Sequence, residues 1–188
     1  MEPGSYSGSS AFKYIDPLIE RGSGELIIVS PYIGDKYADM LIRAGNRRRV
    51  RVITSRSSSE AAKRITNGSM HGVWTAAKAG ALFAVAASAG AYAGIMIIFE
   101  ASAALALASL ALSAYRYRSR KKSNISVRMP ERFVHEKMYI SEDLAIVGSA
   151  NLTYGGTHRN IEHIELIRDP DRIDALVCHF NDLWDASR

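Results

Sequence analysis

The chain has 188 residues, a length that allows one ordinary domain with its own core. Charged residues make up 23% and hydrophobic residues 47% of the sequence, as in globular proteins, and the single cysteine excludes an internal disulfide. The net charge of +5 and the sequence pI of about 9.4 suit a phosphate-bearing partner, either nucleic acid or anionic lipid.

Strand and helix patterns alternate along the chain. Residues 1–10 are polar and rich in glycine and serine, which predicts a loose leader. Interleaved strands and helices predict an α/β fold in a single domain over residues 1–188. The expected helices cover 11–21, 35–44, a segment starting after 54, and 169–186, and the expected strands cover 25–30, 49–54, 125–130, 134–140, 144–149 and 160–167.

Residues 73–115 have a different texture, because these 43 residues contain only two charges, Lys78 and Glu100. A bilayer core about 30 Å thick needs about 20 apolar residues for each helical pass. One straight helix over the whole segment would span roughly 65 Å, about twice that thickness. The segment therefore predicts a two-pass transmembrane hairpin inserted into the α/β domain.

Basic residues flank this insert at 47–64 and 116–122, which places both of its ends, and the α/β domain, on the cytoplasmic side. A tip at Glu100 keeps the carboxylate out of lipid but shortens the second pass, and we favour it. A tip at Gly90–Gly94 balances the passes but buries the carboxylate. The alternative is a soluble, alanine-rich helical hairpin that packs on itself or mediates dimerisation.

The stretch from Val134 to Gly156 carries the groups needed for phosphate chemistry. His135 and Lys137 alternate on an expected strand, so their side chains point to one face. Histidine is a nucleophile or acid–base group near neutral pH, and lysine is a cation for phosphate. Ser149 and Asn151 follow the next strand at the same spacing, and their donors would hold non-bridging phosphate oxygens.

The same stretch resembles the signature of the phospholipase D superfamily, which reads His-x-Lys, four residues, Asp, and then Gly-Ser/Thr-x-Asn. Where the family has aspartate, this sequence has Glu142, followed by Asp143. That acid is usually structural in the family, so the resemblance leaves open which of the two replaces it. Downstream, Asn160 and Glu162 resemble the family's Asn-x-Glu, whose glutamate orients the catalytic histidine. The signature itself is matched by His135, Lys137, Gly148, Ser149 and Asn151.

The resemblance covers most of residues 11–72 and 123–188, and it implies a mixed β-sheet flanked by helices, with 73–115 as an insertion. It also implies a mechanism without metal or other cofactor. One histidine attacks phosphorus, and a second protonates the leaving oxygen and then activates water. The residues carried over are His135, Lys137, Asn151 and Glu162 as catalytic groups, and Lys137, Ser149 and Asn151 as phosphate ligands.

Only one copy of the motif is present, because Lys137 alone among the seven lysines lies two residues after a histidine. The economical solution is a homodimer that shares one active site on its two-fold axis. The other histidines show no metal-ligand spacing.

The sequence thus predicts a membrane-tethered phosphodiesterase. A nuclease is preferred, because small single-motif members of the superfamily include bacterial endonucleases and the membrane-anchored Zucchini-type mitochondrial proteins. Phospholipid hydrolysis or headgroup transfer is the alternative, since a site at a membrane surface meets lipid at high local concentration. A non-catalytic membrane scaffold with a phosphate-binding groove is a second alternative, against which the intact motif residues argue.

Overall fold

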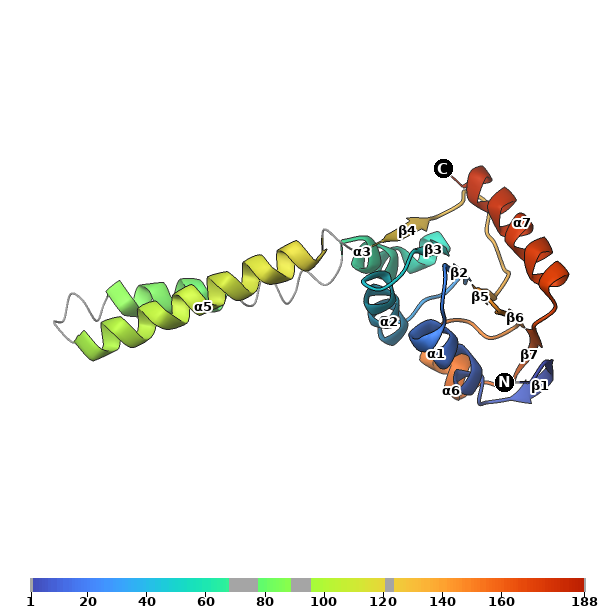
Figure 1. Cartoon of the computed structure of the whole chain (residues 1–188), viewed down its shortest axis with the longest axis horizontal. Helices are drawn as coiled ribbons and strands as arrows, with labels where there is room; N and C mark the ends of the chain where they lie inside the picture. Colours follow the sequence, from blue (N-terminus) through green and yellow to red (C-terminus); the bar gives the residue numbers. More distant parts are fainter. Residues whose placement is uncertain (1, 68–77, 89–95, 121–123, 188) are drawn as a thin grey trace. The chain divides into compact units, whose positions relative to one another are not determined.

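A computed structural model describes residues 2–67, 78–88, 96–120 and 124–187 of the chain (Figure 1). The chain forms two compact units, Met1–Gly68 with Ser123–Arg188, and Ser69–Lys122. The first unit carries the motif residues, and the second is the apolar insert.

A seven-stranded mixed sheet forms the centre of the first unit, in the order β1-β7-β6-β5-β2-β3-β4. The neighbours β2, β3 and β4 run parallel, and all the other neighbouring pairs are antiparallel. The predicted α/β fold with a mixed sheet is therefore confirmed. The strands are β1 (Gly4–Gly8), β2 (Leu26–Val29), β3 (Val50–Ile53), β4 (Ile125–Arg128), β5 (Met138–Ser141), β6 (Leu144–Gly148) and β7 (Glu162–Ile167).

Helices cover both faces of this sheet, as Figure 1 shows. Successive side chains of β2 point to opposite faces of the sheet. Leu26 and Ile28 pack in the cluster under the N-terminal helices, whereas Ile27 and Val29 pack with Phe180 of the C-terminal helix. Burial on both faces explains why β2 is a continuous apolar run, each side chain contributing roughly 1.5–3 kcal/mol. The helices are α1 (Phe12–Arg21), α2 (Asp35–Gly45), the 3₁₀ turn η1 (Arg56–Ser58), α3 (Ser59–Asn67), α6 (Tyr154–His158) and α7 (Pro170–Ala186).

Residues 1–10 correct the prediction of a loose leader. Gly4–Gly8 is an edge strand, β1, paired antiparallel with β7, so that Tyr6 lies opposite Ile164. The Tyr6 ring packs on the core beside Tyr14, with 4.7 Å between ring centroids. A polar serine- and glycine-rich strand carries little apolar signal, and its position depends on a partner strand more than 150 residues away.

Two features near the motif also differ from the prediction, a strand boundary and a short helix. The strand expected over 134–140 begins only at Met138, so His135 and Lys137 lie in the segment that leads into β5. The short helix α6 was not predicted. Thr153 caps it, because its Oγ1 accepts a hydrogen bond from Gly156 N at 3.0 Å.

In the second unit, residues 78–88 and α5 (Met96–Arg120) are helical and pack on each other. A Cβ at Gly80 would lie 3.3 Å from Ser109 Cβ, so small residues allow this close approach. Glu100 lies inside α5, which makes the favoured tip wrong, because alanine and leucine continue the helix through it. The other tip, Gly90–Gly94, lies outside the described residues.

In the part of the chain that the structure describes, no helix combines the length and the apolarity needed to cross a membrane. The transmembrane hairpin predicted over residues 73–115 is left without support.

Candidate active site

The motif residues meet at one end of the sheet, where β2 and β6 end and β5 and β7 begin. The hairpin of β5 and β6 brings Gly148 back to Lys137, and Gly148 N donates to Lys137 O at 3.2 Å. One position further along, Ser149 N donates to His163 O at 2.9 Å. The two halves of the motif are thus joined through adjacent antiparallel strands.

His135 and Lys137 are in direct contact. Lys137 Nζ lies 3.1 Å from Nδ1 and 3.2 Å from Nε2 of His135, and it donates to His135 O at 2.6 Å. Lys137 is 5% exposed, whereas the imidazole of His135 is open to solvent. Burial lowers the pKa of Lys137, and the negative charge of Glu162 opposes this shift. The arrangement holds a buried cation beside an accessible imidazole.

Glu162, the first residue of β7, connects two further motif residues. Its carboxylate accepts hydrogen bonds from Ser149 Oγ and, at 3.1 Å, from Asn160 Nδ2. The resemblance implies that Glu162 orients the catalytic histidine, but here its hydrogen bonds go to Ser149 and Asn160. It acts on Lys137 through its charge.

Asn151 holds a buried amide oxygen, Oδ1, that has no hydrogen-bond partner among the described residues. Such a group costs roughly 1–3 kcal/mol, so it points to a missing partner. A half-turn of the amide would replace this oxygen with two N–H donors at the same buried position. The main chain on both sides is fixed: Tyr139 Oη donates to Ala150 O at 2.6 Å, and Leu152 N donates to Ser30 Oγ at 3.0 Å.

Two glycines are required for this packing. Gly148 has a φ of +156°, and a Cβ there would lie 2.1 Å from His163 O on β7. In α6, a Cβ at Gly156 would lie 2.6 Å from Asn151 O. The helix therefore rests directly on the main chain of Asn151.

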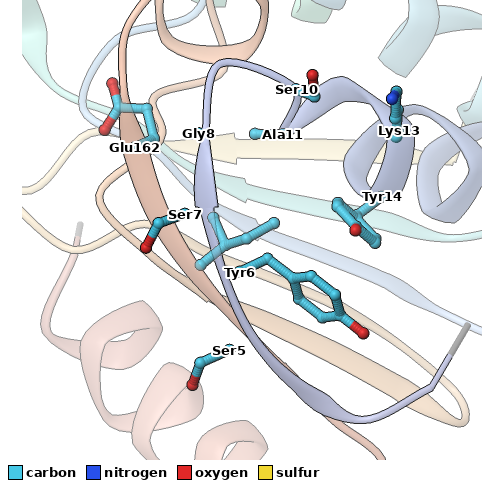
Figure 2. Close-up of a pocket in the computed structure, with 10 residues that line it drawn as sticks. Ser5, Tyr6, Ser7, Gly8, Ser10, Ala11, Lys13, Tyr14 and Glu162 are labelled. Atoms are coloured by element: carbon cyan, nitrogen blue, oxygen red, sulfur yellow. The ribbon is translucent and has the colours of Figure 1, made fainter.

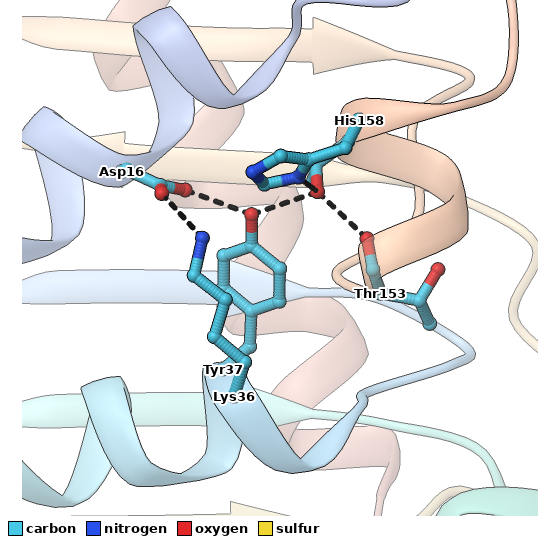
Figure 3. Close-up of polar contacts among 6 residues, drawn as sticks. Asp16, Lys36, Tyr37, Thr153 and His158 are labelled. Atoms are coloured by element: carbon cyan, nitrogen blue, oxygen red, sulfur yellow. Dashed lines mark hydrogen bonds and ion pairs between the residues drawn. The ribbon is translucent and has the colours of Figure 1, made fainter.

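A polar cluster ties α6 to the N-terminal helices, as Figure 3 shows. The hydroxyl of Tyr37 in α2 lies 2.8 Å from both Asp16 Oδ1 in α1 and Thr157 Oγ1 in α6. Lys36 Nζ donates to the same carboxylate at 2.8 Å. Burial raises the pKa of Tyr37, which keeps its hydroxyl protonated. The cluster anchors the helix that packs on Asn151.

His158, at the end of α6, belongs to the same support. Its ring stacks between Phe12 and Tyr154, with centroid distances of 4.3 and 4.5 Å. Burial, helped by Lys36, lowers the pKa of His158, and Asp16 opposes this. His158 therefore helps to hold α6 in place through ring stacking.

A cavity of about 330 Å³ opens beside Glu162 on the side of β1 (Figure 2). Gly8 lies opposite Glu162, and the space around its Cβ position is empty to 4 Å. The sequence missed this cavity because β1 was not expected to be a strand. Its lining includes Ser5, Tyr6, Ser10, Lys13, Tyr14 and Glu162.

Glu142 and Asp143 lie away from this end, in the turn that joins β5 to β6. Asp143 Oδ2 accepts a hydrogen bond from Arg168 Nη1 at 2.8 Å, just beyond β7. The geometry therefore fits a structural acid, and it favours Asp143 for that role.

Residues 15–184 match the family model described as "Cardiolipin synthase, PLD-like domain". The chain belongs to the phospholipase D superfamily. No curated sequence is significantly similar to the chain. The resemblance read from the motif is thereby confirmed, and the match runs through the residues of the insert.

Solved structures share the superfamily fold at low identity. The phospholipase D family member Nuc from Salmonella typhimurium has a TM-score of 0.57 at 17% identity, covering 100% of this chain and 97% of Nuc. NucT from Helicobacter pylori has a TM-score of 0.53 at 13% identity, with coverage of 99% and 98%. Phosphatidylserine synthase from Haemophilus influenzae Rd KW20 has a TM-score of 0.56 at 16% identity, and the match covers 98% of this chain and 39% of the synthase.

Within the described ranges, no group of three or more histidine, cysteine, aspartate or glutamate residues is placed to hold a metal ion. Superfamily membership makes phosphodiester chemistry the activity to test, with nucleic acid and lipid both open as substrates.

Proposed function

We propose that the chain is a phosphodiesterase that acts through a phosphohistidine on His135 and prefers nucleic acid. The observation that supports this most strongly is the contact of buried Lys137 with both ring nitrogens of exposed His135. A phosphate oxygen bound at Lys137 would bring phosphorus next to the imidazole. The neighbouring cation would also stabilise the charge that develops on the phosphate.

Each step has an assigned group. A ring nitrogen of His135 attacks phosphorus, the bond to the leaving oxygen breaks, and that oxygen takes up a proton. Water then cleaves the phosphorus–nitrogen bond and restores the imidazole. Lys137 and Asn151 hold the non-bridging oxygens. Ser149 donates its one hydroxyl proton to Glu162 in this structure, so it would bind a phosphate oxygen only after this proton turns away from the carboxylate.

One chain alone offers no second motif histidine that could protonate the leaving oxygen. The sequence contains one His-x-Lys, so we propose that a second copy of the chain supplies the second histidine. Each subunit of the homodimer would then contribute His135, Lys137, Asn151 and Glu162 to one shared site.

Nucleic acid is the preferred substrate because of the basic net charge of +5 and the resemblance to small single-motif endonucleases. Phospholipid is the second candidate, and the matching model described as cardiolipin synthase and the fold shared with phosphatidylserine synthase favour it. The proposal does not depend on a membrane tether. Exposure of the catalytic unit to the cytoplasm remains a prediction from the charges flanking 73–115, and protease accessibility in spheroplasts tests it.

A substrate panel in the presence of EDTA tests the function. Single-stranded DNA, RNA, cardiolipin and phosphatidylcholine are offered to the full chain and to His135→Ala. The matched control is His179→Gln, which removes an exposed imidazole but keeps a donor for Glu136, to which His179 Nε2 is bonded at 2.9 Å. We expect nucleic acid cleavage that survives EDTA, falls at least about 1000-fold in His135→Ala, and persists in the control. Cleavage of lipid alone would support the second candidate. Binding without turnover of any diester would leave the non-catalytic phosphate-binding scaffold as the remaining candidate.

A further inference from the structure

Exposed apolar side chains of the first unit gather at the catalytic end of the sheet. Tyr32 is 43%, Phe133 56%, Tyr154 53% and Ile161 85% exposed. Tyr32 follows β2, Phe133 precedes β5, Tyr154 follows β6, and Ile161 precedes β7. Clustered exposed apolar groups are characteristic of binding surfaces, so this end of the sheet is a candidate binding surface.

Two of these side chains form a row of rings that ends at the catalytic histidine. The ring centroids of Tyr32 and Phe133 are 6.3 Å apart, and those of Phe133 and His135 are 5.9 Å apart. The rings are tilted by 53° and 44° to each other, and both Tyr32 and Phe133 are exposed. The row therefore ends at the histidine that is proposed to attack phosphorus.

The loop that carries Tyr32 is fixed before any ligand arrives. Ser30 Oγ donates to Tyr32 O at 2.8 Å, and Ser58 Oγ donates to Pro31 O at 3.0 Å. Ile33 N in turn donates to Ser58 Oγ at 3.1 Å. A ligand that stacks on the Tyr32 ring would therefore meet a preorganised surface, with little ordering cost for the loop.

Two exposed arginines lie close to these rings in the sequence or next to the segment that holds them. Arg132 directly precedes Phe133, and Arg56 begins η1, whose Ser58 holds the Tyr32 loop. Aromatic faces interleaved with cations are the usual surface for single-stranded nucleic acid, since every base has a face that can stack. Bases inside a duplex have no free face, and lipid chains would be better matched by aliphatic side chains than by this pair of rings.

We propose that Tyr32 and Phe133 form a stacking platform for the unpaired bases next to the scissile phosphate, which makes single-stranded nucleic acid the substrate. This inference rests on the proposed phosphodiesterase function. It assigns specificity to two residues outside the signature motif.

The test compares two single-stranded oligonucleotides of equal length and charge, one with bases and one with abasic residues throughout, in EDTA. For the wild-type chain we expect kcat/KM to be at least about fivefold higher on the base-bearing strand, as stacking of one base predicts. Phe133→Leu and Tyr32→Leu should lose most of this ratio, since they keep apolar surface but remove the ring. Tyr32→Phe should keep it.

Tyr115→Leu, on the exposed surface of the second unit, is the matched control and should behave as wild type. Equal cleavage of both strands, or equal ratios in wild type and Phe133→Leu, would overturn the inference while leaving the phosphodiesterase intact. Equal loss on both strands together with dissociation of the dimer would also overturn it, because the rings would then belong to a subunit contact. Cleavage of phospholipid only, or of no diester at all, would remove its basis in the proposed function.

Discussion

Gly156 rests against the main chain of Asn151, where a Cβ would come within 2.6 Å of the carbonyl oxygen and 2.8 Å of the nitrogen. Gly156→Ala must therefore push Asn151, which the proposed mechanism uses to hold phosphate, out of place. We expect a loss of about 1–3 kcal/mol in the free energy of unfolding and a roughly 10- to 100-fold lower kcat. Denaturant unfolding and initial rates measure both quantities.

The neighbouring glycine provides the control for that experiment. A Cβ at Gly155 would meet nothing closer than 3.9 Å, so Gly155→Ala should retain activity and stability. If the two variants behaved alike, the packing of α6 on Asn151 would not position its side-chain amide for the proposed reaction.

The buried charge of Lys137 should lower the free energy of unfolding while it supports turnover. Its lowered pKa means that the folded chain holds this proton less readily than the unfolded chain. Its charge is therefore a cost to stability below the folded pKa, and the cost disappears as pH rises toward the ordinary lysine value. Lys137→Met should abolish turnover and yet melt about 2–4 °C higher for each kcal/mol of relieved cost. A variant that melted well below wild type in a thermal scan would show that the cation supports the fold.

His158 should make stability depend on pH in the mildly acidic range. Its pKa is lowered in the folded state, so below the ordinary value of about 6.5 the unfolded chain takes up the proton more readily. The free energy of unfolding should rise as pH increases from below the folded pKa to about 6.5, and the slope should flatten in His158→Phe, which preserves the ring stack. Urea titrations across this range compare the two proteins, and an unchanged slope in the variant would assign the dependence to other groups.

A shared active site has a quantitative consequence in mixtures. If both histidines of a dimer are needed, refolding wild type with an equal amount of His135→Ala should leave about one quarter of the activity of an all-wild-type sample at the same total concentration. Independent sites within each chain would leave about one half. Rates are measured over a series of mixing ratios. Activity should fall with the square of the wild-type fraction for a shared site, and in direct proportion to that fraction for independent sites.

Sequence reasoning was most successful where a pattern is local. The buried run of β2, the Asp-Pro start of α7 and the spacing of His135 and Lys137 each reflect nearby residues, and all three appear in the structure. The capping carboxylate of Asp169 accepts from Arg172 N at 3.0 Å, as a helix start of this type requires.

The failures concern relationships between distant segments. β1 becomes a strand because β7 offers it a partner, and nothing in its serines and glycines announces this. The resemblance implied that Glu162 orients the histidine, but its hydrogen bond goes to Ser149, and this pairing depends on the register between β6 and β7. The row from Tyr32 to His135 likewise joins residues about a hundred positions apart, so only the folded chain shows it.

The central claim is that His135 is the nucleophile, and trapping the intermediate tests it most directly. The full chain is mixed with a ³²P-labelled single-stranded oligonucleotide in EDTA and quenched in alkali, which preserves phosphohistidine, and the labelled peptide is mapped by mass spectrometry. The account predicts label on His135 that is absent from His135→Ala and retained in His179→Gln. Cleavage of the oligonucleotide with no label on His135, or with label on another residue, would contradict it.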